Sequence, residues 1–273
     1  MEETVRQSSG SGWWIPDIKG IHRAREVFFM LLRRQFLSRY QQSALGVAWA
    51  VLNPLGSLLV FWILFGQILQ VSGDGYPYAV FAFTGMITWG IFQNSCLATA
   101  SSLQEHIGIV SKVYFPRIIL PGVNLGRAGI DACISLIILF IFNLCNGYVY
   151  WGRLIYIPFL LVVILLCGLS VGLIFAGPSV KFRDLNVPLN YIIQLAMYIT
   201  PVIYPPTLVP SSLSWILQLN PMYWVIAWAR WIFIGQQTEI TMLLYLSIGL
   251  TLGLLVMGWY VFALTERYIV DVQ

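Results

Sequence analysis

The stretch that decides the fold is 154-LIYIPFLLVVILLCGLSVGLIFAG-177, a run of 24 residues without a charged side chain. A helix of about 20 apolar residues crosses the hydrocarbon core of a bilayer, whereas a barrel strand needs only about half as many. The run is too long for a barrel strand. It therefore predicts a membrane-spanning α-helix.

The rest of the chain has the same character. Of its 273 residues, 59% are apolar and only 10% are charged, against about 25% charged in an ordinary soluble domain. This composition excludes a soluble globular enzyme, a disordered chain and a disulfide scaffold. With 154–177, the segments of spanning length predict six transmembrane helices, at about 46–70, 78–99, 118–144, 154–177, 188–204 and 240–264.

The N-terminal segments differ from these spans. Residues 1–20 are rich in Gly and Ser and are interpreted as a mobile cytoplasmic tail. Residues 21–42 carry apolar residues at helical spacing with arginines on other faces, which predicts an amphipathic helix in the membrane interface. Residues 43–267 are expected to form a single transmembrane domain, followed by a short tail at 268–273.

Between the fifth and sixth spans the apolar pattern is broken. Prolines precede Ser211–Leu219, and Asn220-Pro221 separates that piece from Met222–Ile234. Each piece is too short to cross a bilayer, so we predict two short re-entrant helices on the outer side, at about 205–235. Pro201 is expected to kink the fifth span. The alternative is one kinked seventh span, which would place the C-terminus on the other side.

The positive charges support the six-span arrangement. With the N-terminus in the cytoplasm, all of the 15 Lys and Arg residues except Arg153 and Arg230 fall in cytoplasmic segments. Such an excess is typical of the cytoplasmic side of membrane proteins. We therefore predict an all-α integral membrane protein with cytoplasmic N- and C-termini.

Motifs for catalysis are missing. The chain has no G-x-x-x-x-G-K-[ST] for nucleotide phosphates and no H-E-x-x-H, and its two histidines are far apart, so neither a metal site nor an enzyme is predicted. The clear ionisable candidate inside a span is Asp131, with Arg127 one turn before it. The pair is interpreted as an i, i+4 ion pair or, alternatively, as a functional site. The driving force for transport is thus expected from a partner. The net charge of +4 is too mild to indicate nucleic acid.

Several stretches, taken in order, carry a family resemblance. They are Arg39-Tyr40-x-x-Ser43-x-Leu45-Gly46-x-x-Trp49-x-x-Leu52-x-Pro54, Gly85-x-x-x-Trp89-x-x-Phe92, Ser111-Lys112-Val113-x-Phe115-Pro116-Arg117-x-x-Leu120-Pro121, Phe182-Arg183-Asp184, Thr200-Pro201-Val202-x-Tyr204, and Leu219-Asn220-Pro221-Met222 followed by Arg230. Over about residues 20–267 this set resembles the transmembrane subunit of type-2 ABC exporters for polysaccharides, the permeases of O-antigen, capsule and teichoic acid.

The resemblance implies a homodimer that works with two copies of a separate P-loop ATPase. ATP and Mg would then be bound by the partner, with no cofactor on this chain. The implied substrate is a polysaccharide on undecaprenyl diphosphate, moved from the cytoplasmic to the outer face of the bacterial inner membrane. The alternatives are a type-2 ABC exporter of a drug or a free lipid, and a membrane-embedded enzyme of lipid-linked glycan synthesis, which would need a polar catalytic cluster.

Two cytoplasmic sites are expected. The segment at about 101–116 mixes polar and apolar residues and is interpreted as a coupling helix for the ATPase, or alternatively as a plain turn. Its candidate residues are Glu105, Ile109, Lys112 and Phe115. Guanidinium groups suit a lipid diphosphate, although they also suit anionic headgroups. The candidates for diphosphate recognition are Arg33, Arg34 and Arg39, with Leu45 and Gly46.

Two further sites follow from aromatic and external residues. Sugar rings stack on aromatic side chains, so the predicted glycan path consists of Trp49, Trp62, Trp89, Tyr191 and Tyr198. The alternative for these residues is packing against lipid. The external hairpin is predicted to be a gate, or alternatively a cap that stabilises the dimer. Its candidate residues are Pro201, Trp215, Asn220, Pro221 and Arg230.

Overall fold

A computed structural model describes residues 25–41, 48–110, 116–237 and 239–271. Nearly all of these residues are helical, and among them no strand forms. The one exception to helices and loops is an isolated antiparallel bridge between Gly73 and Tyr76. The prediction of an all-α fold is confirmed. The predicted tail at 1–20, and Leu45 and Gly46, lie outside the described residues.

The helices follow one another closely along the chain. In order they are α2 (Arg25–Gln41), α3 (Ala48–Phe61), the π-helix η1 (Trp62–Ile68), α4 (Tyr78–Glu105), α5 (Ile107–Val110), α6 (Ile119–Cys145), η2 (Trp151–Tyr156), α7 (Ile157–Ala176), α8 (Pro178–Lys181), η3 (Arg183–Leu185), α9 (Asn186–Ile199), η4 (Pro206–Leu208), α10 (Ser211–Leu219), α11 (Pro221–Ile234) and α12 (Met242–Asp271).

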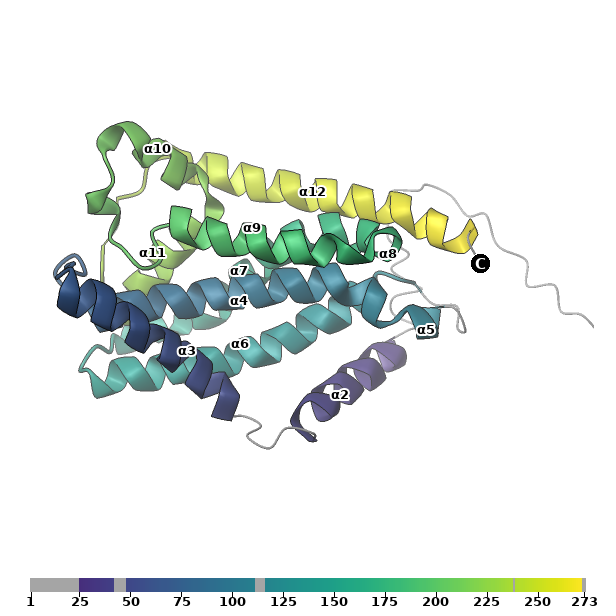
Figure 1. Ribbon diagram of the computed structural model, residues 1–273, viewed down its shortest axis with the longest axis horizontal. Helices are drawn as coiled ribbons and strands as arrows, with labels where there is room; N and C mark the ends of the chain where they lie inside the picture. The colour runs from purple at the N-terminus through teal and green to yellow at the C-terminus, as the bar shows by residue number, and fades with distance from the viewer. Residues whose placement is uncertain (1–24, 42–47, 111–115, 238, 272–273) are drawn as a thin grey trace, which may run out of the picture.

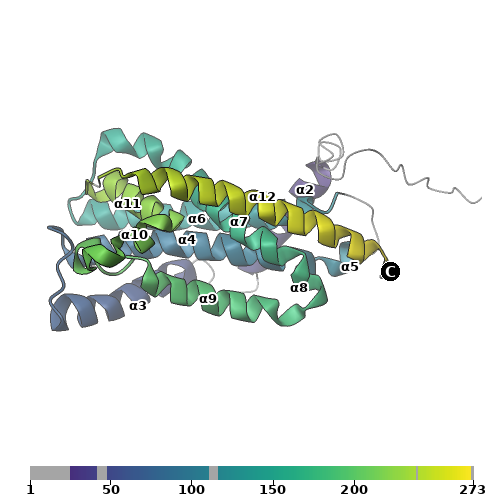
Figure 2. The same ribbon diagram turned by 90° about the horizontal axis from the view of Figure 1, so that it is seen from above.

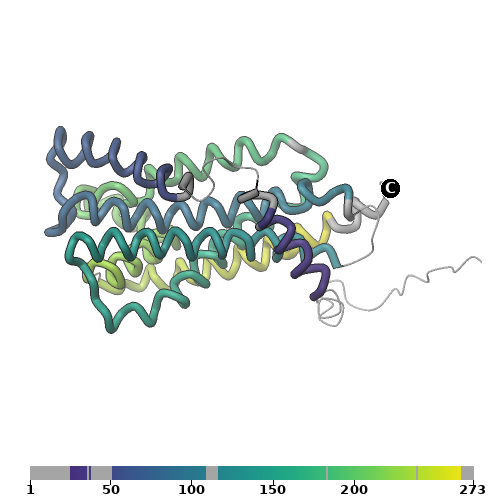
Figure 3. The backbone as a smooth tube through the Cα atoms, turned by 90° about the horizontal axis from the view of Figure 1, so that it is seen from below, coloured from purple at the N-terminus to yellow at the C-terminus, as the bar shows by residue number. Residues whose placement is uncertain are grey.

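The long helices form one elongated bundle (Figures 1 and 2). The chain direction alternates through α3, α4, α6, α7, α9 and α12. The helices α10 and α11 lie at one end of the bundle, which we call the external end, and α5 and α8 lie at the opposite end, which we call the coupling end. Figure 3 shows α2 set at an angle to the bundle near the coupling end, where it packs against α6.

Four helical segments are long and apolar enough to cross a membrane. They are Val51–Ile68, Ile119–Cys145, Trp151–Ala176 and Met242–Thr265. The chain is therefore a multi-pass membrane protein. Neither α4 nor α9 is among the four, so the count of six spans, the cytoplasmic position of both termini and the role of the external hairpin stay predictions.

Helix α4 is the centre of the bundle and contacts α6, α7, α9 and α11. It buries the hydroxyls of Thr84, Thr88, Ser95 and Thr99, and each hydroxyl donates to a carbonyl three or four residues earlier in the same helix. Helix α7 approaches this face closely, because a Cβ on Gly172 would lie 2.5 Å from Thr99 Cβ. Small residues permit such close helix contacts in membranes. These polar residues lower the hydropathy of α4 although the helix is well packed.

At the external end, Asn220 separates α10 from α11. Its side chain accepts a hydrogen bond from the Met222 backbone N–H at 3.0 Å and so caps α11, while Pro221 occupies the first turn. The expected kink at Pro201 is wrong, because α9 ends at Ile199, two residues earlier. Thr200 is extended (φ −79°, ψ 139°), as the residue before a proline prefers.

Candidate functional site

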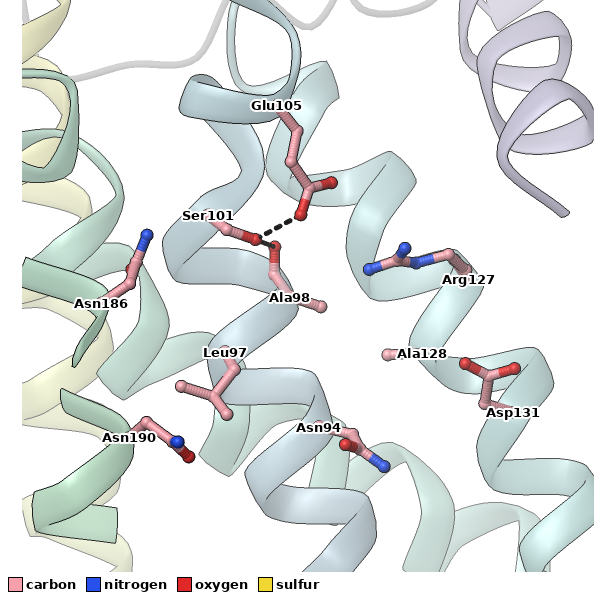
Figure 4. A pocket seen from close by; sticks show the side chains of 10 residues that line it. All are labelled: Asn94, Leu97, Ala98, Ser101, Glu105, Arg127, Ala128, Asp131, Asn186 and Asn190. Atoms are coloured by element: carbon pink, nitrogen blue, oxygen red, sulfur yellow. Dashed lines mark hydrogen bonds between the residues drawn. The ribbon is translucent and has the colours of Figure 1, made fainter. Parts of the chain in front are cut away.

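A polar pocket opens along α4 on the half of the bundle nearest the coupling end (Figure 4). We call it the polar groove. Its volume is about 500 Å³. The described residues that line it come from α4, α6 and α9: Asn94, Leu97, Ala98, Ser101, Glu105, Arg127, Ala128, Asp131, Asn186 and Asn190.

Helical periodicity brings these residues to one place. On α4, Asn94, Ser101 and Glu105 recur at spacings of seven and four residues, which places them on one face. Asn186 and Asn190 are four residues apart on α9, and Arg127 and Asp131 are four apart on α6. Figure 4 shows the α6 and α9 side chains on opposite sides of the α4 face. The groove is thus a strip of α4 with a polar wall on either side.

Hydrogen bonds hold part of the groove in place. Glu105 Oε1 accepts from the Ser101 hydroxyl at 2.7 Å, and Glu105 Oε2 accepts from Asn124 Nδ2 at 3.1 Å. On the α9 side, Gln93 Nε2 donates to Asn190 Oδ1 at 3.2 Å. The Glu105 carboxylate is therefore oriented by both α4 and α6.

Two polar atoms of the groove have unused hydrogen-bonding capacity. Arg127 Nε and Asn186 Oδ1 are both buried, and neither has a hydrogen-bond partner among the described residues. The Asn186 amide nitrogen, by contrast, donates to Gln104 Oε1 at 2.6 Å. Both atoms have almost no solvent-accessible surface, so a bond to water or to a ligand requires the Arg127 or Asn186 side chain to turn toward the groove.

A polar network connects the Glu105 end of the groove to α2. Gln35 Nε2 donates to Asn124 Oδ1 at 2.6 Å and lies 3.0 Å from His106 Nε2, while Asn124 Nδ2 donates to the Ala98 carbonyl at 2.8 Å. His106 Nδ1 is 2.8 Å from the Ser102 carbonyl. Movement at the end of α4 would therefore affect both the groove and α2.

A second polar assembly lies at the external end, where Arg230 of α11 is 2% exposed. Its Nη2 donates to the Val202 carbonyl at 2.7 Å, and its guanidinium lies 3.5 Å from the ring centroid of Phe81 on α4. A Cβ on Gly85 would meet both the Val202 carbonyl and Arg230 Nη2. Arg230 thus fastens α11 and the segment after α9 to α4.

Asp74 closes the same assembly from the loop before α4. It accepts hydrogen bonds from Thr207 Oγ1 at 2.8 Å and from Gln236 Nε2 at 3.2 Å, and it interacts electrostatically with Arg230. Asn220 Nδ2 adds a bond to Thr200 Oγ1 at 2.8 Å. One carboxylate therefore joins the loops on both sides of the external hairpin. We call Asp74, Thr207, Gln236, Arg230 and Val202 the external clasp.

The predicted cytoplasmic sites are partly described. Glu105 points into the polar groove, whereas Ile109 belongs to α5 with its side chain outside the description, and Lys112 and Phe115 lie outside it altogether. Arg33 and Arg34 are exposed on α2, and the side chain of Arg39 is not described. The coupling and diphosphate roles of these residues stay predictions.

The predicted aromatic path is dispersed. Trp89 is buried (2% exposed) and packs against Phe92, with ring centroids 5.2 Å apart. Trp62 is exposed on η1, Tyr191 and Tyr198 are exposed on α9, and the side chain of Trp49 is not described. None of the four described rings is among the described residues of the groove. The path assignment stays a prediction.

The predicted gate residues sit together at the external end. Pro201 and Arg230 are buried, Asn220 and Pro221 form the junction of α10 and α11, and Trp215 is exposed on α10. Their gating role stays a prediction.

The groove asparagines and Ser101 were not predicted from the sequence. Their only signal was polar residues at helical spacing within otherwise apolar segments. Among the described residues, no group of three or more His, Cys, Asp and Glu side chains is placed to hold a metal ion.

Comparison with known proteins covers most of the chain. Residues 26–234 match the family described as ABC-2 type transporter. The O-antigen export system permease protein RfbA of Klebsiella pneumoniae is 27% identical over 202 residues, which are 72% of this chain and 76% of the relative. The Myxococcus xanthus protein of the same name is 28% identical over 207 residues, 75% of this chain and 79% of the relative.

Another relative matches over a longer stretch. The polysialic acid transport protein KpsM of Escherichia coli is 24% identical over 230 residues, 83% of this chain and 85% of the relative. The family match covers most of the chain, including the groove, the ordered motifs and all of the external clasp except Gln236. The resemblance predicted from those motifs is confirmed: the chain belongs to the ABC-2 type transporter family.

Proposed function

We propose that this chain is the permease subunit of an ATP-driven exporter that moves a polysaccharide linked to undecaprenyl diphosphate to the outer face of the bacterial inner membrane. The observation that carries the proposal is that relatives aligned over about three-quarters of the chain are named for O-antigen export and for polysialic acid transport. A multi-pass membrane protein with a polar groove beside its central helix has the architecture that such transport needs.

The proposal includes a partner ATPase and a second copy of this chain. The sequence contains no P-loop for nucleotide phosphates, so ATP and Mg are expected on two copies of a separate subunit. The dock for that subunit is the segment at about 101–116. Its described part begins with the last turn of α4, where Ser101 and Glu105 lie, and His106 directly after α4 joins the network with α2. Pressure on this segment would therefore move α4 and the groove together.

The external hairpin is proposed as the outer gate. An exporter of a polymer must open to a chain of sugars and must not leak ions at rest. Helices α10 and α11 are too short to span. Apolar side chains of α11 pack in the core against α4 and α7, and the external clasp adds a small number of polar contacts. Opening the gate would require α11 to shift within the core that it shares with α4 and α7, and breaking the clasp would make that shift easier.

The test is export in the organism that makes the polysaccharide. Deletion of this chain should remove the polysaccharide from the cell surface and leave its lipid-linked form on the cytoplasmic face, and the intact chain should restore export. The purified chain alone should hydrolyse no ATP, and hydrolysis should depend on adding the partner ATPase. Unchanged surface polysaccharide after deletion would instead favour an exporter of a drug or a free lipid.

A further inference from the structure

We propose that the polar groove binds sugar units of the transported lipid-linked polysaccharide, which we call the passenger. The sugars that it binds are those next to the lipid carrier, and the groove does not bind the diphosphate. This inference rests on the proposed function and assigns a binding site to residues that are not part of the predicted aromatic path. It is argued from the donor and acceptor set of the groove, from its buried atoms without partners and from its charge.

The side chains of the groove match a neutral molecule with many hydroxyls. Asn94 presents both a donor and an acceptor. Asn186 and Asn190 each use one amide atom in a bond to a neighbouring glutamine, and the Ser101 hydroxyl, which donates to Glu105, can still accept. A sugar hydroxyl also donates and accepts, so it can bond to any of these groups. Leu97, Ala98 and Ala128 supply an apolar surface for the C–H face of a sugar ring. The volume of about 500 Å³ lies within the range of small-molecule sites, roughly 300–1,000 Å³.

The atoms without partners point to a ligand that both donates and accepts. Arg127 Nε needs an acceptor, and Asn186 Oδ1 needs a donor. A phosphate oxygen would satisfy the first of these atoms and not the second, because an ionised phosphate donates no hydrogen bond. Hydroxyl groups on a sugar satisfy both.

The charge of the groove favours the sugar part of the passenger over its diphosphate. The described lining contains two carboxylates, Glu105 and Asp131, and one guanidinium, Arg127. A diphosphate carries negative charge and would be repelled by the two carboxylates, of which half-buried Asp131 is less screened by solvent than exposed Glu105. Carboxylates bond well to sugar hydroxyls, so they favour the neutral part of the passenger.

The position of α2 allows both halves of the passenger to be held at once. Arg33 and Arg34 are exposed on α2, and α2 is tied to the Glu105 end of the groove through Gln35 and Asn124. Figure 4 shows α2, in purple, beside that end. The diphosphate would remain at the arginines while the first sugars enter the groove.

A set of variants tests the charge argument through the rate of export in cells. Asn94→Leu and Asn190→Leu should each slow export at least fivefold, and Glu105→Gln and Asp131→Asn should also slow it. Asn146→Leu, an exposed asparagine at the external end of α6, is the matched control and should leave export unchanged. Faster export after loss of either carboxylate, with Arg127→Gln as the most harmful change, would show a diphosphate site and overturn the proposal.

Thiol protection tests occupancy directly and does not depend on the variants being active. The full chain, with its four cysteines replaced, carries Ser101→Cys in the groove or Ser72→Cys in the exposed loop before α4 as a control. A membrane-permeant maleimide labels cells that make the complete lipid-linked glycan and cells whose synthesis stops at the lipid diphosphate. Labelling at position 101 should be at least threefold slower only where sugars are present, and labelling at position 72 should be the same in both.

The outcomes separate this inference from the function on which it rests. Equal labelling at position 101 in both kinds of cell, or protection by the lipid diphosphate alone, overturns the groove assignment even if export still requires this chain. Export that survives deletion of the chain overturns the proposed function instead. The amount and monodispersity of each purified variant show that the chain has folded.

Discussion

Replacement of Asp74 by Asn is the most informative perturbation of the external end. The change removes a negative charge and leaves the size of the side chain nearly the same. Asp74 has a positive φ of 54°, and Asn adopts this left-handed conformation more readily than most residues. The variant therefore alters the electrostatics of the external clasp with little backbone strain.

The expected magnitude follows from the contacts that are lost. Asn keeps one oxygen for Gln236, and its Nδ2 can donate to the Thr207 hydroxyl, so both bonds can form but neither is charge-assisted; each falls from about 1.5–3 to about 0.5–1.5 kcal/mol. Thr207 is exposed and can bond to water, which reduces the loss, whereas buried Arg230 loses a favourable charge. We expect a destabilisation of about 2 kcal/mol, which lowers Tm by about 4–8 °C for a domain of this size.

Thermal unfolding of the full chain in detergent, followed by intrinsic fluorescence, measures this change. Glu239→Gln, which neutralises an exposed acidic residue between α11 and α12, is the matched control and should move Tm by less than about 1 °C. Asp74→Ala should be worse than Asp74→Asn, because alanine adds about 1–2 kcal/mol in a left-handed conformation.

A double-mutant cycle with Arg230→Met isolates the interaction between the two charges. If the charges act together, the two changes should be non-additive by at least about 0.5 kcal/mol. A Tm for Asp74→Asn within about 1 °C of the unaltered chain, or strictly additive effects, would refute the clasp.

Three other predictions concern packing, coupling and the gate. Gly85→Ala should lower the free energy of unfolding by about 1–3 kcal/mol, because the added Cβ overpacks against Val202 and Arg230. Gly90→Ala, with nothing within 4 Å of its Cβ, should be neutral or stabilising. Equal Tm values for the two variants would contradict the packing. Lys112→Glu should reduce co-purification of the ATPase several-fold, and Lys181→Glu on α8 is the comparison; normal association and export would remove Lys112 from the dock. Ser212→Cys on α10 should form disulfides between subunits and block export, and ready cross-linking with undiminished export would place the gate elsewhere.

The fold was predicted from local patterns in the sequence. Such patterns were sufficient for features that depend on a single helix. A run such as 154–177 contains enough apolar residues to identify a span without knowledge of its neighbours. Pro201 shows the limit of this reasoning. Its missing N–H predicts an interrupted helix, but whether the helix bends or ends depends on partners elsewhere, here the bond from Asn220 to the Thr200 hydroxyl.

The polar groove could be predicted only in part. Each helix carries its own contribution at a visible spacing, such as Asn186 and Asn190 on α9 or Arg127 and Asp131 on α6. Which helices meet along α4 is set by tertiary packing, and one sequence does not contain that information in a local pattern. Trp89 was predicted to contact sugar because it is aromatic, but the helix bundle buries its side chain. That burial also depends on tertiary packing.

The hydroxyl-rich face of α4 has a consequence for how the protein is made. The ribosome delivers α4 to the membrane before α6 and α7, so this face meets lipid before its permanent neighbours exist. The bonds from Thr84, Thr88 and Thr99 to carbonyls of the preceding turn keep each hydroxyl satisfied during that interval. Helix α4 can therefore enter the membrane with these hydroxyls already satisfied, before the helices that later cover them have been made.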